Sequence, residues 1–78
     1  MGIKSVPINK FRKYLKSLGL ELIRTKDSHE IYDYPDKHLL RPVTIDVNYP
    51  DVPQLHIHTN LKTLGINKKD FEEAIKNF

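Results

Sequence analysis

The side chains best suited to chemistry surround a histidine in the first half of the 78-residue chain. His29 follows Asp27 and Ser28, and the cations Arg24 and Lys26 stand just before them. A histidine can accept or donate a proton near neutral pH, because its unperturbed pKa is about 6.5. Arginine and lysine beside it would stabilise negative charge on a phosphate. This combination is suited to cleaving RNA, whose own 2′-hydroxyl is the nucleophile, so that neither a metal nor an enzyme nucleophile is needed.

The same residue types allow other interpretations. Asp27, Ser28 and His29 are the residue types of a serine-hydrolase triad, but neighbouring residues of a strand point to opposite faces and cannot align as one. Tyr32 and Tyr34 share a strand face and could stack on bases, although packing across strands is the commoner role of such tyrosines. The second proton transfer of RNA cleavage is left to His29 itself, to water or to Tyr32.

A histidine pair later in the chain raises the question of a metal site. His56 and His58 stand two residues apart, a spacing that brings both side chains to one face of a strand but separates them on a helix. With His29 or His38 as a third ligand, they would form a zinc site. The stretch that carries the pair has helical periodicity, so we expect these side chains to line or cap a helix. We expect no metal and no other cofactor.

Positive charge is concentrated in the first third of the chain. Residues 1–26 contain seven basic residues and one acidic residue, whereas residues 27–78 contain six basic and nine acidic residues, for a net charge of +3. Lys10, Lys13 and Lys16 lie on the polar side of a predicted helix, and we expect them to bind RNA phosphates. The chain has no cysteine and no apolar run long enough to cross a membrane. We therefore expect a soluble, cytoplasmic protein without a membrane partner.

A single domain over residues 1–78 is expected to position these side chains, with three helices. After an extended lead-in, Met1–Val6, apolar residues at helical spacing predict a helix over Pro7–Leu18, which Gly19 ends. The same spacing predicts a second helix over Pro53–Leu64. A third helix is predicted to begin after Asn67, a residue type that caps helix N-termini.

Three strands are predicted between the first two helices. Period-two alternation and flanking turn residues place them at Leu20–Thr25, His29–Tyr34 and Val43–Asn48. The order α-β-β-β-α-α predicts a small α+β sandwich, in which helices cover one face of a three-stranded antiparallel sheet. His29 shares its strand parity with Ile31, the best core candidate of that strand, so a twist or bulge is needed to expose the histidine.

The order and spacing of these motifs resemble the HicA toxin family. The lysine-rich helix is followed by Gly19-Leu20, by a strand with Arg24 and by Lys26-Asp27-Ser28-His29, where the family has a Gly-Ser-His tripeptide. The run Asn60–Asn67 followed by Asp70-Phe71 is similar to the family's C-terminal signature of a leucine-bearing helix, Gly-Ile and an acidic-Phe pair. The resemblance covers roughly residues 8–75. It departs from the family at Asp27, which stands in place of the glycine. It also departs after the third strand, where the nearest approach to the family's Pro-x-His segment is Val52-Pro53-Gln54-Leu55-His56.

The resemblance implies a fold like that of a double-stranded-RNA-binding domain. It also implies a metal-independent endoribonuclease that acts on mRNA, the activity of an mRNA interferase. HicA proteins are the toxins of type II toxin–antitoxin pairs and are held inactive by a HicB-type antitoxin. The implied partners are therefore mRNA and a HicB-like protein. His29 matches the family's motif histidine and carries over as the catalytic residue, and Ser28 matches the serine before it.

We therefore expect a ribonuclease that depends on one histidine. His29 is the expected general base or acid, and the expected RNA-binding or charge-stabilising residues are Lys10, Lys13, Lys16, Arg24, Lys26 and Ser28. Two alternatives from other classes stay open. One is a catalytically inactive module with the same fold that binds RNA or protein. The other is a structural protein that oligomerises through the solvent-exposed face of the sheet.

Overall fold

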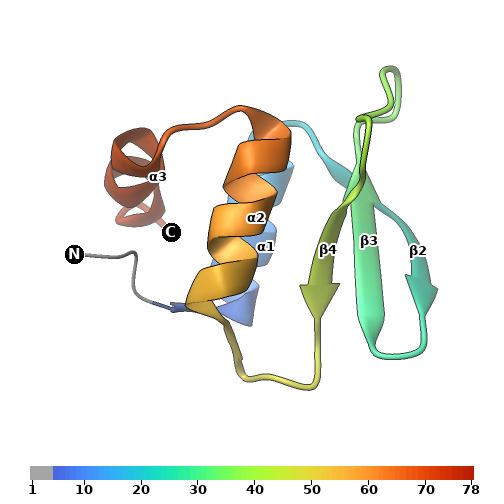
Figure 1. The fold of residues 1–78 in the computed structure, drawn as a ribbon, viewed down its shortest axis with the longest axis horizontal. Helices are drawn as coiled ribbons and strands as arrows, with labels where there is room; N and C mark the ends of the chain where they lie inside the picture. The colour runs from blue at the N-terminus through green and yellow to red at the C-terminus, as the bar shows by residue number, and fades with distance from the viewer. Residues whose placement is uncertain (1–4) are drawn as a thin grey trace.

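The computed structural model, which describes residues 5–78, contains three helices and a three-stranded antiparallel sheet, with α3 on the far side of the other two helices from the sheet (Figure 1). The elements follow the order β1 (Val6–Pro7), α1 (Ile8–Ser17), β2 (Glu21–Lys26), β3 (His29–Asp33), β4 (Val43–Asp46), β5 (Asp51–Val52), α2 (Gln54–Leu64) and α3 (Lys68–Ile75). The predicted α+β class, antiparallel sheet and three helices are confirmed. Residues 1–4 of the predicted extended lead-in lie outside the described residues.

The three long strands lie in the order β2-β3-β4, with β3 in the centre. A two-residue loop joins β2 to β3 and brings Lys26 directly opposite His29. Asp27, the first residue of this loop, has φ +54°, in the left-handed region that glycine, asparagine and aspartate tolerate best. On its other side, β3 pairs with β4 so that His29 lies opposite Asp46.

The two edges of the sheet differ. β4 is covered by α2, which runs beside it (Figure 1) and donates a hydrogen bond from Asn60 Nδ2 to the Thr44 carbonyl at 3.2 Å. β2 forms the other edge, and all six of its residues are exposed. The simple alternation predicted for this strand fails because the register shifts between Leu22 and Arg24, which leaves Ile23 as a bulge.

The core lies between the helices and one face of the sheet. Its fully buried large side chains are Phe11, Leu15, Leu20, Val43, Ile45, Val52, Ile57 and Phe71. Tyr14 is also buried in this core, and its ring meets the Phe71 ring edge-on, with the ring centroids 5.0 Å apart. Edge-to-face contact is the favourable geometry for such a pair. The aromatic cluster therefore ties α1 to α3.

A second, two-stranded pairing joins the starts of two helices. Val6 in β1 pairs with Val52 in β5, and the Ile8 N–H donates to the Pro50 carbonyl at 3.2 Å. The sequence predicts no strand before the first helix or between the third strand and the second helix. Strands of two residues carry no periodic signal, which is why neither of them was predicted.

Turns and caps set the remaining boundaries. The Asn67 side chain accepts a hydrogen bond from the Asp70 N–H at 2.8 Å, so the predicted cap of α3 is confirmed. Gly65 ends α2 at φ +72°, where the sequence predicts the helix to stop. The third long strand ends at Asp46 and not at Asn48. The Asp46 side chain accepts from the Asn48 N–H at 3.0 Å and so forms a turn, which leaves Val47 39% exposed.

Candidate functional site

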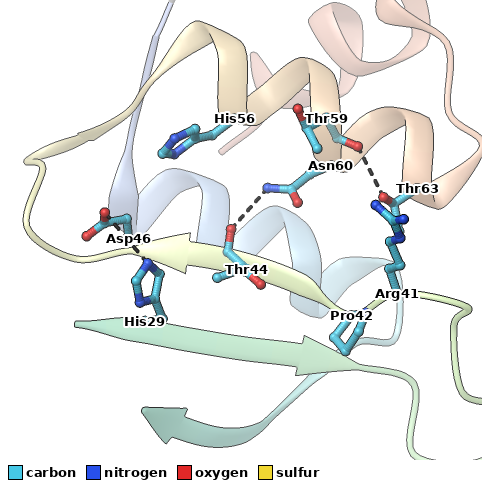
Figure 2. Close-up of a pocket in the computed structure, with 9 residues that line it drawn as sticks. All are labelled: His29, Arg41, Pro42, Thr44, Asp46, His56, Thr59, Asn60 and Thr63. Atoms are coloured by element: carbon cyan, nitrogen blue, oxygen red, sulfur yellow. Dashed lines mark hydrogen bonds and ion pairs between the residues drawn. The ribbon is translucent and has the colours of Figure 1, made fainter. Parts of the chain in front are cut away.

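A pocket of about 280 Å³, lined mostly by residues with polar side chains, lies between the sheet and α2 (Figure 2). The sheet contributes His29, Thr44 and Asp46, and the segment before β4 contributes Arg41 and Pro42. The other wall belongs to α2, whose lining residues are His56, Thr59, Asn60 and Thr63. The helix repeat of 3.6 residues brings these four to one side of α2. The pocket therefore combines two histidines, a carboxylate and a guanidinium with neutral hydroxyl groups.

His29 stands at the mouth of this pocket with its side chain 48% exposed. Its Nε2 lies 3.8 Å from Asp46 Oδ2, which is too long for a hydrogen bond but close enough for an ion pair with the protonated ring. Asp46 is itself held in place, because its Oδ1 accepts the Asn48 N–H. A fixed carboxylate beside a half-exposed imidazole stabilises the charged form that the ring takes after accepting a proton.

The neighbours of His29 on β3 show which way it faces. Glu30 accepts two hydrogen bonds from Arg12 of α1, Nε to Oε1 at 2.9 Å and Nη2 to Oε2 at 2.8 Å. The Tyr32 hydroxyl donates to Glu30 Oε1 at 3.0 Å. Since successive strand residues alternate between faces, His29 points away from α1. Ile31 shares that face and is buried, as predicted, although the main core cluster lies on the other face. His29 is exposed on this face without a twist.

On the α1 side of the sheet, Arg12, Glu30 and Tyr32 are hydrogen-bonded to one another. The paired hydrogen bonds from the Arg12 guanidinium lower the pKa of Glu30, against an opposing effect of burial, and Glu30 in turn raises the pKa of Arg12. Burial raises the pKa of Tyr32, and its hydrogen bond to Glu30 adds to the effect. Tyr32 lies on the face opposite His29. It does not fit the predicted role of second proton-transfer group.

The predicted cations fall into two groups. Register places Lys26 beside His29 and Arg24 beside Ile31, so both cations share the sheet face of His29 and both are exposed. The lysines of α1 lie on the other side of the sheet, because α1 packs against the face that carries Glu30. The structure brings together His29, Arg24 and Lys26, and it separates them from Lys10, Lys13 and Lys16.

Ser28 acts through its backbone. Its carbonyl accepts the Val47 N–H at 2.8 Å, which fastens the tip of the β2–β3 hairpin to the chain just after β4. The Ser28 side chain is half-buried and does not line the pocket. Ser28 therefore helps to hold His29 against Asp46.

His38 belongs to a separate structural cluster. Asp33 is only 3% exposed and accepts hydrogen bonds from the N–H groups of Tyr34 at 2.8 Å and Leu39 at 2.9 Å. His38 Nδ1 lies 3.2 Å from its second oxygen. The Leu39 N–H, partly offset by burial, and then the Tyr34 N–H and His38 lower the pKa of Asp33. This carboxylate organises the loop after β3, and His38 is part of that loop.

Sequence patterns alone did not assign Asp46, Arg41 and His56 to the site. The sequence raises His56 as a zinc ligand. A signal for its place in the pocket lies in the helical repeat, which sets it on the same side of α2 as Asn60. The signal for Asp46 was the polar face of the clearest strand. Neither pattern shows that α2 lies beside β4, and this packing creates the pocket.

The described part of the chain contains neither a cluster of metal-ligating side chains nor a membrane-spanning helix. Within residues 5–78, no group of three His, Cys, Asp or Glu side chains is arranged to hold a metal ion. His56 lines the pocket whereas His58 does not, as expected for two residues 200° apart around a helix. None of the helices in these residues is long and apolar enough to span a membrane.

The fold and the site together define a small α+β protein with a histidine-bearing polar pocket at the edge of its sheet. Comparison with known proteins gives no match, whether to a family model, to a curated protein sequence or to a solved structure.

Proposed function

We propose that this protein is a metal-independent endoribonuclease that cleaves mRNA. The observation that carries the proposal is the setting of His29. Its ring is half-exposed at the mouth of a polar pocket, with Lys26 in register on one side and Asp46 at 3.8 Å on the other. A proton-transfer group with a cation beside it supplies two of the parts that RNA cleavage requires, and the fixed carboxylate supports the protonated ring.

The proposed chemistry uses the nucleophile of the RNA itself. His29 takes part in proton transfer at the 2′-hydroxyl or at the leaving 5′-oxygen, and Asp46 stabilises its protonated ring. Arg24 and Lys26, on the same sheet face, stabilise the negative charge that develops on the phosphorus centre. Lys10, Lys13 and Lys16, across the sheet, would contribute sequence-independent affinity for RNA phosphates and not the chemical step.

The biological setting we propose is that of a HicA-type toxin. The support is the motif order described for the sequence, together with the element order α1-β2-β3-β4-α2, which fits a fold like that of a double-stranded-RNA-binding domain. Its partners would then be cytoplasmic mRNA and a HicB-like antitoxin. Asp27 is compatible with activity, because it occupies a left-handed loop position that suits glycine and does not line the pocket.

The test is RNA cleavage in EDTA by the wild type, His29→Ala and His58→Ala. His58 is the matched control, since it is an exposed histidine outside the pocket. We expect the wild type and His58→Ala to cleave, and His29→Ala to lose about 10²- to 10⁴-fold in rate while keeping its fold and its RNA affinity. Equal cleavage by all three proteins would assign the activity to another site or to a contaminant. Absence of cleavage by the wild type would refute the proposal.

A second candidate is a binding module with the same fold that holds RNA or a protein partner without cutting RNA. The observation that favours it is the open edge strand β2, where Leu22 and Ile23 are each 47% exposed. An unpaired edge strand with apolar side chains is suited to a partner chain. Salt-dependent RNA binding without cleavage, by a folded wild type, is the result expected of this candidate.

A further inference from the structure

We propose that His56 is the second proton-transfer residue of the site and acts as the general acid, with His29 as the general base. The inference rests on the proposed ribonuclease function and names the partner that the sequence left open. RNA cleavage needs one group to remove the 2′ proton and another to protonate the leaving oxygen, and both groups must reach the same phosphate. A second histidine in the same pocket meets that requirement.

The two histidines come from opposite walls of one pocket. His29 is at the start of β3, and His56 is in the first turn of α2. Figure 2 shows both rings at the same end of the pocket, where β4 ends at Asp46. A phosphodiester entering there would have one imidazole on the sheet side and the other on the helix side. This arrangement suits an in-line displacement, in which the attacking and leaving oxygens are on opposite sides of phosphorus.

The position of His56 is set by contacts on both sides. The Asn60 amide, one turn further along α2, donates to the Thr44 carbonyl and holds the helix against β4. On the other side, the Tyr49 ring meets the His56 ring edge-on, with centroids 6.0 Å apart and planes at 81°. His56 is partly buried as a result. Groups held in this way keep the geometry that proton transfer requires.

The difference between the two surroundings assigns the roles. His29 has the carboxylate of Asp46 at 3.8 Å, which favours the imidazolium that forms when a base accepts a proton. Within the described residues, no ion pair joins His56 to a carboxylate. His56, on the opposite wall of the pocket, is the other histidine that could donate a proton there. His29 is therefore the base, and His56 is the acid.

The reaction balances without metal or water. His29 takes the proton of the 2′-hydroxyl as the 2′-oxygen forms a bond to phosphorus, and His56 gives its proton to the 5′-oxygen as the bond from phosphorus to that oxygen breaks. The products are a 2′,3′-cyclic phosphate and a 5′-hydroxyl end. Arg41 is the one arginine or lysine among the pocket-lining residues. It lies at the other end of the pocket, beside Thr63, where it would hold a neighbouring phosphate of the RNA backbone.

The test compares two substrates in EDTA, an ordinary RNA and the same RNA with sulfur in place of the 5′-bridging oxygen at the cleaved position. Thiolate is a good leaving group that needs no protonation, so loss of the general acid does not slow cleavage of the sulfur substrate. We expect His56→Ala to cleave ordinary RNA about 10²- to 10⁴-fold more slowly and to cleave the sulfur substrate at close to the wild-type rate. His29→Ala should be slow on both substrates. His58→Ala, on the same helix but outside the pocket, should match the wild type on both.

Each other outcome overturns the assignment in a distinguishable way. Normal cleavage of ordinary RNA by His56→Ala, with His29→Ala inactive, leaves the ribonuclease proposal standing and removes His56 from it. Slow cleavage of both substrates by a folded His56→Ala refutes the acid role. No cleavage by the wild type refutes the ribonuclease function and this inference together. His56→Gln keeps a polar side chain of similar size and serves the same comparison if the alanine variant does not fold.

Discussion

Glu30 and His29, on opposite faces of the sheet, differ in their exposure and in their hydrogen bonds. Toward α1, Glu30 is bonded to Arg12 through both carboxylate oxygens and to the Tyr32 hydroxyl, and its side chain is only 17% exposed. On the other face, one residue earlier in the chain, the His29 side chain is 48% exposed and its nearest charged partner is 3.8 Å away. Neighbouring residues of a single strand thus have nearly opposite surroundings.

This difference separates structural from chemical roles. Hydrogen bonds that are already satisfied within the protein stabilise it and offer nothing to a ligand, as in the Arg12–Glu30 pair. A half-exposed imidazole beside a fixed carboxylate costs the folded protein little stability and is free to act on a ligand. The face bonded to α1 therefore holds the fold, and the face that carries His29 holds the candidate site. Each of the following variants tests one side of that division.

Among these variants, we expect the largest effect on RNA cleavage from removing the cations of one face. The double variant Arg24→Ala/Lys26→Ala removes two positive charges from the face of His29, and we expect RNA cleavage at saturating substrate to fall by roughly 10- to 100-fold. Lys13→Ala/Lys16→Ala removes the same charge from exposed positions of α1. It should weaken RNA binding and reduce its salt dependence, with less effect on the saturated rate. Rate loss confined to the α1 variant would reverse our division of the two faces.

A second effect is expected on stability and its dependence on pH. Glu30→Gln should lower the free energy of unfolding at pH 7 by about 1–2 kcal/mol, because it weakens hydrogen bonds to a charged partner that is itself partly exposed. The folded-state pKa of Glu30 lies below its ordinary value of 4.5. Its contribution is therefore fully present above about pH 5 and is lost as pH falls through the lowered folded pKa.

Urea unfolding of both proteins between pH 3 and 7 measures this effect. The difference between wild type and Glu30→Gln should shrink as pH falls, while Asp33, whose pKa is also lowered, gives both proteins a shared loss of stability in acid. Glu21→Gln, an exposed carboxylate on β2, is the control and should match the wild type at every pH. A difference that stays constant with pH would show that the charge of Glu30 does not carry the effect.

The smallest effect is expected at the hairpin loop between the two faces. Asp27→Gly should stabilise the protein by less than about 1 kcal/mol, since relief of the left-handed conformation at φ +54° is partly offset by the greater freedom of glycine in the unfolded chain. Cleavage should be unchanged, because Asp27 does not line the pocket. Thermal unfolding and the EDTA assay measure both quantities. A large gain in cleavage would show instead that the Asp27 carboxylate repels the substrate.

Most helix boundaries followed from the sequence because they depend on local chemistry. Asn67 caps α3 through the next turn, and Gly65 ends α2 in a conformation that few other residues adopt. The core face of β3 could not be predicted in the same way. Ile31 is more apolar than Tyr32, but the tyrosine hydroxyl is satisfied by Glu30, and this allows its ring to be buried on the core side.

Only part of the candidate site could be predicted from the sequence. His29, Arg24 and Lys26 lie close together in the sequence, and hairpin pairing alone places Lys26 opposite His29. Asp46, Arg41 and His56 reach the pocket only because β4 pairs with β3 and α2 packs beside β4. Contacts between segments so far apart are a property of the whole fold, and no local pattern encodes them. For the same reason, the sequence could not show that the α1 lysines, which were expected to bind RNA phosphates, lie across the sheet from His29.

The pairing of Val6 with Val52 has a consequence for the order in which a nascent chain acquires its parts. A two-residue loop joins β2 to β3 and residues 34–42 join β3 to β4, so these strands can pair before α2 is made, which brings His29 beside Asp46. β1 finds its partner only after residue 52 has emerged, and the second wall of the pocket arrives later still, with residues 54–64. During synthesis, the sheet with His29 therefore forms before α2 is present, and the pocket is complete only after α2 has packed beside β4.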